Sequence, residues 1–288
     1  MITSMTGYGK SVSQLPQRKI TVEIRTLNSK TLDLNLRLPS AYREKELELR
    51  QIIAAQLSRG KVDVSLYIEE TGSTSGQQLD IAKIEAYISQ LCTIDQINDN
   101  EKIKLVEIAA TFPDVFISTQ TEVDETEFTA IIDIFKNCLQ AVNEFRNKEG
   151  SILKSEFEKR ISNISNLLDE VIKEDKSRLD EVRTRLEKAV EDLKEKVDEN
   201  RFEQELIYYL EKYDITEEKV RLKNHLNYFK ETMETPDSQG KKLGFISQEI
   251  GREINTIGSK ANHAAMQQMV VQMKDELEKI KEQMLNVL

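Results

Sequence analysis

The chain has 288 residues, and its 51 Asp and Glu outnumber its 41 Lys and Arg, which gives a formal charge of −10. With 10 Gly, 4 Pro and 32% charged residues, it is typical of a chain rich in solvated helices and not of an all-β protein with many tight turns. The acidic total argues against nucleic acid as a partner. Two cysteines, Cys92 and Cys138, make no disulfide framework, and we expect both to be buried thiols.

The first ten residues lack the charged start and the apolar run of a signal peptide, and no stretch approaches 18 apolar residues. The sequence therefore predicts a soluble, cytoplasmic protein without a membrane partner. Counted by segment, residues 1–66 carry a net charge of +5, residues 67–200 carry −13 and residues 201–288 carry −2. The basic N-terminal part could meet a polyanion, although +5 is also ordinary for a mixed sheet.

Residues 1–70 are predicted to form mostly strands. Apolar and polar residues alternate over 20–27, 32–38 and 62–68, a period of two that is typical of half-buried strands. Ser40, which follows Pro39, is a candidate N-cap for a helix through residue 57. Residues 71–78 have the Gly, Ser and Thr content of a loop.

From residue 79 the apolar period becomes that of helices. Helices are expected over 79–92, 102–110 and 127–147, followed by a tract over 153–197 whose apolar residues step by three and four. A polar run over 173–178, which we assign to a solvated surface, interrupts this tract, so it is either a hairpin or one long helix with a weak joint. The last helix carries a methionine stripe from Met266 to Met284 that suits either a core or a subunit interface.

These patterns predict an α+β protein with a small N-terminal mixed or antiparallel sheet domain, a long coiled-coil-like helical arm and a helical C-terminal domain. We expect the N-terminal α+β domain over 1–150, with its basic sheet over 1–70 and its helices over 79–147. The arm is expected over 151–200. The helical C-terminal domain, with the candidate metal and phosphate site, is expected over 201–288.

The segment from Ser4 to Ser11, S-M-T-G-Y-G-K-S, approaches the phosphate-loop pattern G-x-x-x-x-G-K-[ST], but Ser4 replaces the first glycine. The residues that follow have no helical pattern. The sequence therefore favours a turn or hinge at Gly7 and Gly9 over a nucleotide-binding loop, and no nucleotide cofactor is expected.

The last third of the chain has spacings that suit a metal site. His225, one of two histidines, is expected on a helix for which Thr216 is a candidate N-cap, with Glu218 and Arg221 on the same face. The same Glu–Arg spacing is also how exposed helices form surface ion pairs, in which case it marks no site.

On a second predicted helix, Glu249 and Glu253 are four residues apart and project together. Packing this face on the first helix would gather His225 with three carboxylates, a donor set that suits Mn²⁺ or Mg²⁺. Such an ion lowers the pKa of a bound water and holds a phosphodiester, while arginines neutralise phosphate charge.

Segments at both ends of the chain carry a family resemblance. In the N-terminal part they are S-M-T-G-Y-G at 4–9, E-I-R at 23–25 with Asn28, L-D at 32–33, L-R-L-P at 36–39 and S-R-G-K-V at 58–62. In the C-terminal part they are Q-E at 204–205, D-I at 214–215, E-E at 217–218, R-L at 221–222 with His225, G-K-K-L at 240–243, Q-E at 248–249, R-E-I-N-T at 252–256 and G-S-K-A at 258–261. With these segments the chain resembles the YicC family of bacterial proteins, described as endoribonucleases.

The resemblance implies a homo-oligomer, a hexameric ring or clamp, that cuts RNA internally with a divalent metal ion, Mn²⁺ or Mg²⁺. It implies metal binding or water activation by Glu205, Glu218, His225, Glu249 and Glu253. The implied catalytic group is His225, Glu249, Glu253 and Arg252. The residues implied to hold RNA are Arg221, Arg252, Asn255 and Lys260 at the phosphate, and Arg25, Asn28, Arg37 and Lys61 along the backbone.

One position departs from the family pattern. After Asn28 we expect a His-Arg pair, and this chain has Ser29-Lys30. Lys30 keeps a positive charge for RNA but loses bidentate recognition of phosphate. The first hypothesis is therefore a metal-dependent endoribonuclease. The alternative is a non-catalytic RNA-binding scaffold or adaptor in RNA turnover, and a third interpretation is a purely structural role for the apolar stripes.

Overall fold

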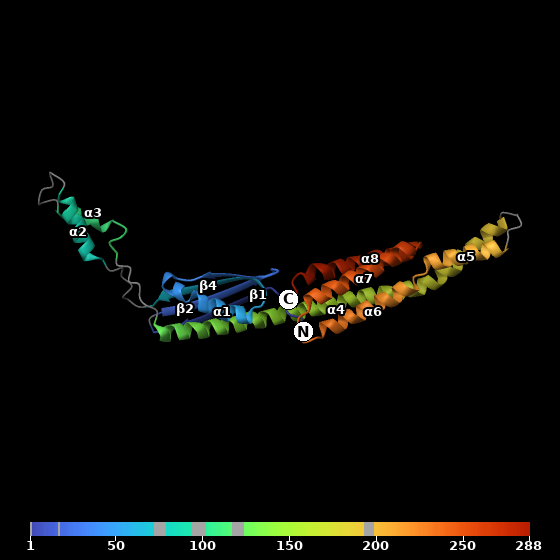
Figure 1. The fold of residues 1–288 in the computed structure, drawn as a ribbon, viewed down its shortest axis with the longest axis horizontal. Helices are drawn as coiled ribbons and strands as arrows, with labels where there is room; N and C mark the ends of the chain where they lie inside the picture. The colour runs from blue at the N-terminus through green and yellow to red at the C-terminus, as the bar shows by residue number, and fades with distance from the viewer. Residues whose placement is uncertain (1, 17, 72–78, 94–101, 117–123, 193–198) are drawn as a thin grey trace.

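The computed structural model describes residues 2–16, 18–71, 79–93, 102–116, 124–192 and 199–288. One helix, α4 (Glu125–Asp192), runs along most of the elongated molecule (Figure 1). A four-stranded sheet packs beside the first part of α4. Three helices, α6 (Thr216–Met233), α7 (Gly240–Lys260) and α8 (Ala264–Met284), lie beside its second part. The expected α+β class is confirmed.

The sheet contains β1 (Gly7–Gln14), β2 (Arg18–Leu27), β3 (Leu32–Arg37) and β4 (Gly60–Glu70) in the order β1-β2-β4-β3. It is mixed, because β3 runs parallel to β4 while the other pairs are antiparallel. Between β3 and β4 the 3-10 turn η1 (Ser40–Lys45) leads into α1 (Glu46–Gln56). The predicted Ser40 N-cap is wrong, because Ser40 lies inside η1 and makes no capping bond.

One face of the sheet is covered by helices. Its strands turn Ile20, Val22 and Ile24 toward a core that also holds Phe135 and Val142 of α4. The helix comes so close to β1 that a Cβ added at Gly9 would lie 2.5 Å from the backbone oxygen of Cys138. The turn or hinge predicted at Gly7 and Gly9 is therefore wrong: both residues lie in β1, and Gly9 is needed for close packing.

A small helical lobe lies beyond the far end of the sheet (Figure 1). It consists of α2 (Ile81–Leu91) and α3 (Lys102–Ala110), whose buried contacts centre on Ile84, Ala109 and Val115. Cys92, just after α2, is exposed, so the expectation of a buried thiol is wrong there. It is right for Cys138, which lies under the sheet and whose pKa burial raises to about 11.

The tract after residue 153 belongs to α4, which continues through residues 173–178, so the long-helix alternative is confirmed as far as residue 192. The end of the predicted tract (193–197) and most of the predicted loop (72–78) lie outside the described residues. The solvated surface predicted for that run is wrong at Asp175 and Arg178, which are both buried and form an ion pair with each other. After α4 the chain returns through α5 (Glu199–Tyr213). The domain boundaries at residues 150 and 200 stay predictions, and α4 passes through residue 150 without a break.

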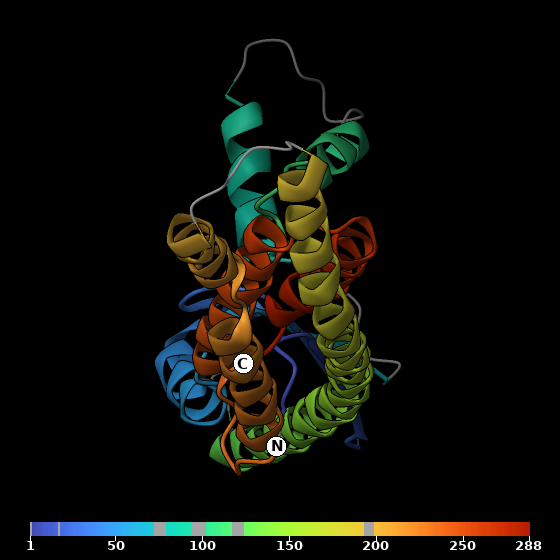
Figure 2. The ribbon, with the colours of Figure 1, turned by 90° about the vertical axis from the view of Figure 1, so that its right-hand side faces the viewer.

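The second core lies between α4, α6, α7 and α8, which stand side by side in the end-on view of Figure 2. Met266, Met273 and Met284 face this core, which confirms the core alternative for the methionine stripe. Among the described residues no helix is long and apolar enough to cross a membrane.

The first residues of the chain pack against the last ones. The Met5 amide donates to the Asn286 carbonyl at 2.8 Å, and the Leu288 amide donates to the Thr3 carbonyl at 3.0 Å. Strand β1 begins just after these first residues, and α7 begins at Gly240, whose amide donates to the Leu288 carbonyl at 3.1 Å. The end of the sheet therefore meets the start of α7. This seam places residues from both halves of the chain next to each other.

Candidate active site

Helices α6 and α7 form an antiparallel pair that carries most of the predicted site. The first turn of α6 is held by Asp214, whose Oδ1 accepts from the Thr216 amide at 2.9 Å. Hydrogen bonds from the Thr216 side chain and backbone hold the pKa of Asp214 below its usual range. The predicted N-cap at Thr216 is wrong by one position, since Thr216 is the first helical residue and Ile215 precedes it.

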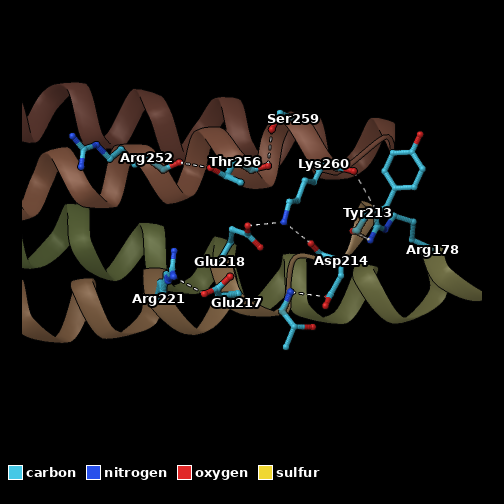
Figure 3. A network of polar contacts seen from close by, with 11 residues as sticks. Arg178, Tyr213, Asp214, Glu217, Glu218, Arg221, Arg252, Thr256, Ser259 and Lys260 are labelled. Atoms are coloured by element: carbon cyan, nitrogen blue, oxygen red, sulfur yellow. Dashed lines mark hydrogen bonds and ion pairs between the residues drawn. The ribbon is translucent and has the colours of Figure 1, made fainter. Parts of the chain in front are cut away.

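A polar network fixes the position of α6 against α4 and α7 (Figure 3). Lys260 at the end of α7 pairs with Glu218 in the first turn of α6, with 2.7 Å between Nζ and Oε1, and also donates to the Asp214 carbonyl at 3.0 Å. Arg178 of α4 donates to the Tyr213 carbonyl at 2.8 Å. Lys260 was predicted to hold phosphate and Glu218 to bind a metal ion. In the structure the two form an ion pair with each other.

Sequence reasoning missed Asp175, Arg178 and Lys219 as positioning residues. The Lys219 ammonium lies 2.7 Å from Asp175 Oδ2, while Asp175 Oδ1 pairs with Arg178 at 2.7 Å. The spacing of these residues along α4 could have predicted that Asp175 and Arg178 are buried. Asp175 and Arg178 follow Val171 by steps of four and three, so they continue the apolar stripe of α4 into the core.

The Glu218–Lys260 contact also sets the register between the two helices. His225 lies seven residues after Glu218, and Glu253 lies seven residues before Lys260. Seven residues are almost two full turns of an α-helix, a rise of about 10 Å, and they return to nearly the same face. Because α6 and α7 are antiparallel, His225 and Glu253 lie at about the same level along the pair.

Glu253 is an unusual carboxylate. It is only 8% exposed, and within the described part of the chain it has no hydrogen-bond or ion-pair partner. The half-buried His225 likewise has no polar partner among the described residues. The carboxylate oxygens of Glu253 still reach solvent, because they are not among the fully buried polar atoms that lack a partner in the described residues. Among the described residues, these two side chains are therefore free to contact a ligand.

Two exposed arginines lie beside this pair. Arg252 is 71% exposed and contacts Glu249 at 2.6 Å, while Arg221 is 57% exposed and pairs with Glu217. Both are surface ion pairs within one helix, as the alternative interpretation of the spacing predicted. Such exposed pairs are weak, so either guanidinium can exchange its partner for a phosphate. Asn255 is exposed on α7, one turn beyond Arg252.

The expected gathering of Glu218, His225, Glu249 and Glu253 around one ion does not occur within a single chain. Across the residues that the structure describes, no group of three or more His, Cys, Asp or Glu is placed to share a metal. The reason is the register, which puts Glu218 two turns away from His225 and ties it to Lys260.

Comparison with known proteins decides the family. The model of the region described as "Endoribonuclease YicC-like, N-terminal region" matches residues 2–155, and that described as "Endoribonuclease YicC-like, C-terminal" matches residues 171–288. The chain belongs to the YicC-like endoribonuclease family. Two full-length relatives are named probable endoribonuclease YicC: one from Clostridioides difficile strain 630, 32% identical over 293 residues, and one from Haemophilus influenzae strain Rd, 29% identical over 289 residues. In each case the whole of both chains is covered.

The remaining predicted residues of this YicC-like chain fall into separate places. Arg25, Lys61 and Arg37 lie on the open face of the sheet, away from the helices that cover its other face. Arg25 also lies over the Tyr8 ring, at 5.7 Å from its centroid. These cations face solvent among carboxylates, because Arg25 lies 3.6 Å from Glu23 and the strand register sets Asp63 opposite Arg25 and Asp33 opposite Lys61. Their predicted contact with RNA stays a prediction.

Asn28 and Lys30 lie beyond β2, at the seam with α7 and α8. The Asn28 side chain donates to the Leu285 carbonyl at 2.6 Å, which ties this loop to the end of α8. Glu205 is exposed on α5, before the turn at Asp214 that leads into α6. It does not join the His225–Glu253 pair.

Proposed function

We propose that this protein cuts RNA internally and that the phosphodiester is cleaved at the His225–Glu253 pair. The observation that carries this assignment is the Glu253 side chain, which is 8% exposed, has no partner among the described residues and lies at the same level of the helix pair as His225. Membership of the YicC-like endoribonuclease family over nearly the whole chain supports the reaction class.

The pair would carry the proton transfers as a base and an acid. One member takes the proton from the attacking oxygen, either water or the 2′-hydroxyl of the RNA, and this oxygen forms a bond to phosphorus while the bond from phosphorus to the leaving oxygen breaks. The other member, in its protonated form, donates a proton to the leaving oxygen. Arg252 and Arg221, once released from their surface ion pairs, hold the extra negative charge on the phosphate. The product ends distinguish the two attacks, since 2′-hydroxyl attack leaves a cyclic phosphate.

We also propose a divalent cation, Mn²⁺ or Mg²⁺, at Glu253. These ions are commonly held by one or two carboxylates together with substrate phosphate and water, so a cluster of three protein ligands is not required. Glu253 supplies a carboxylate that no residue of the described chain neutralises, and Glu249 lies one turn away. When bound, such an ion polarises the phosphate and acidifies a coordinated water.

RNA would be held by the open face of the sheet through Arg25, Arg37 and Lys61, mainly by its phosphates. The family resemblance further supports a homo-oligomeric clamp, a hexamer, in which several such faces surround one RNA. Light scattering after size-exclusion chromatography measures the number of subunits. A monomer at micromolar concentration would contradict the clamp.

The cleavage test compares three variants on a structured RNA with and without Mn²⁺. We expect Glu253→Gln and His225→Gln to lower the cleavage rate by about 100-fold or more while RNA affinity changes little. Glu231→Gln, an exposed carboxylate on the same helix as His225, is the matched control and should cut like the wild type. Full cutting by a folded Glu253→Gln variant would reject the site. A wild-type protein that binds RNA but never cuts it would favour the scaffold alternative.

A further inference from the structure

A pocket of about 540 Å³ lies at the seam between the sheet and the C-terminal helices. Its walls come from the loop after β2, the residue before β4, the first turns of α7 and the last turns of α8. Four cationic side chains line it: Lys30, Arg59, Lys241 and Lys281. No aspartate or glutamate is among its lining residues.

The positive charge of this pocket is largely uncompensated. In the described part of the chain, Lys30 and Lys241 have no ion-pair partner. Arg59 donates through Nε to the Ser29 carbonyl at 3.1 Å, which leaves its terminal nitrogens without a carboxylate. Lys281 alone is paired, with Glu278 at 2.7 Å. Three free cations at one concave surface attract an anion, and the N-terminal turn of α7 adds partial positive charge.

The rest of the lining does not suit a bare anion. Met5, Met284 and Leu285 give the pocket an apolar floor, and Gly244 leaves open space where a side chain would otherwise stand. The carboxamide of Gln248 borders the same space. Apolar surface next to a side-chain amide is suited to a nucleobase, whose faces are apolar and whose edge carries donors and acceptors.

We propose that this pocket binds one nucleotide unit, with its phosphate at the four cations and its base on the methionine floor. The volume suits a ligand of that size. The inference rests on the proposed function in one respect: we take the nucleotide to be an unpaired residue of the RNA. A free mononucleotide has the same chemistry and is the other possible source.

The first arm of the test measures binding to the full chain by calorimetry, with uridine 5′-monophosphate, uridine and inorganic phosphate as probes. We expect the monophosphate to bind at least about tenfold more tightly than either part alone. Arg59→Gln and Lys241→Gln should each weaken it about fivefold or more. Lys274→Gln removes the same charge from an exposed position on α8 and should have no effect. Because Lys241 has no partner to lose, its variant tests the pocket even if Arg59→Gln is unstable.

Unchanged monophosphate binding in both pocket variants, or equal binding of inorganic phosphate, would overturn the proposal. The second arm uses a single-stranded oligouridylate. Weaker binding by both pocket variants supports an RNA nucleotide, whereas unchanged RNA binding alongside lost monophosphate binding would overturn the RNA source. If wild-type protein binds nucleotide through this pocket but cuts no RNA, the proposed function fails and the pocket stands. If pocket variants bind like the wild type while RNA is still cut, the pocket fails alone.

Discussion

Glu218 and Lys260 tie the first turn of α6 to the last turn of α7, with 2.7 Å between the carboxylate and the ammonium. Their environments differ, because the glutamate side chain is 8% exposed and the lysine side chain is 33% exposed. This pair sets the helix register on which the His225–Glu253 arrangement depends.

Removing the lysine and removing the glutamate should lower the stability of the protein by different amounts. Lys260→Met leaves a buried carboxylate without its cation, whereas Glu218→Gln leaves an ammonium that can reach water. We expect the free energy of unfolding to fall by about 3 kcal/mol for Lys260→Met and by about 1 kcal/mol for Glu218→Gln, measured by urea denaturation. Lys136→Met, which removes an exposed partner of Asp133, should cost less than about 0.5 kcal/mol. Equal losses from the two buried-pair variants would contradict the asymmetry.

Glu276 of α8 should make stability sensitive to acid. Burial raises the pKa of its carboxyl, but hydrogen bonds from Asn163, Lys279 and Arg160 outweigh burial and hold the pKa at about 2, against an ordinary value of 4.5. The contribution of Glu276 is therefore complete above pH 4.5 and is lost as the pH falls toward 2.

Over that window the unfolding free energy of the wild type should fall more steeply than that of Glu276→Gln. Urea denaturation at pH 7, 4 and 3 gives both slopes. Glu282→Gln, on the exposed side of the same helix, should keep the wild-type slope. Parallel curves for Glu276→Gln and the wild type would show that this carboxylate is not the acid-sensitive group.

Substitution by alanine should change the free energy of unfolding in opposite directions at two glycines. A Cβ at Gly9 would lie 2.5 Å from the Cys138 carbonyl oxygen, so Gly9→Ala must push α4 away from β1. We expect a loss of about 2 kcal/mol or more. At Gly244, inside α7, a Cβ would meet nothing within 4 Å, so Gly244→Ala should add up to about 1 kcal/mol through helix propensity. Thermal unfolding of both variants checks the pair, and a neutral Gly9→Ala would refute the close contact.

The proposed cation can be tested without any cleavage assay. An ion that binds only the folded chain raises the unfolding midpoint, so about 1 mM Mn²⁺ should raise that of the wild type by about 2–4 °C. EDTA should reverse the shift. Glu253→Gln should lose it, and Glu231→Gln should keep it. If Mn²⁺ shifts the Glu253→Gln midpoint as much as that of the wild type, the ion binds elsewhere.

Local patterns predicted the elements well because they report on single strands and helices. The alternation around Ile20–Ile24 and the three-four steps of Phe157 and Ile161 identified faces that are indeed buried. The errors lie where tertiary contacts decide. Asp175 and Arg178 are polar residues that α6 buries with Lys219, and Gly9 is small because α4 passes close to it.

The candidate site was predictable only in part for the same reason. Helical spacing puts His225 and Glu253 on defined faces, but only the contact between Glu218 and Lys260 shows that they lie level. The cations of the seam pocket were not identified as a group. Arg59 and Lys241 lie in short segments, R-G-K and G-K-K, that are about 180 residues apart in the sequence, and no local pattern indicates that they share a surface.

The sharing of α4 between two cores has a consequence for the order in which the protein folds during synthesis. The covered face of the sheet needs Phe135 and Val142, so it stays exposed until the first part of α4 has left the ribosome. The first residues can pack only after the last helices have been made, because Ile2 belongs to the core of those helices and the Met5 amide donates to the Asn286 carbonyl. A nascent chain therefore carries an apolar sheet without its α4 cover until Val142 has been made, and the beginning of the polypeptide is the last part to reach its place.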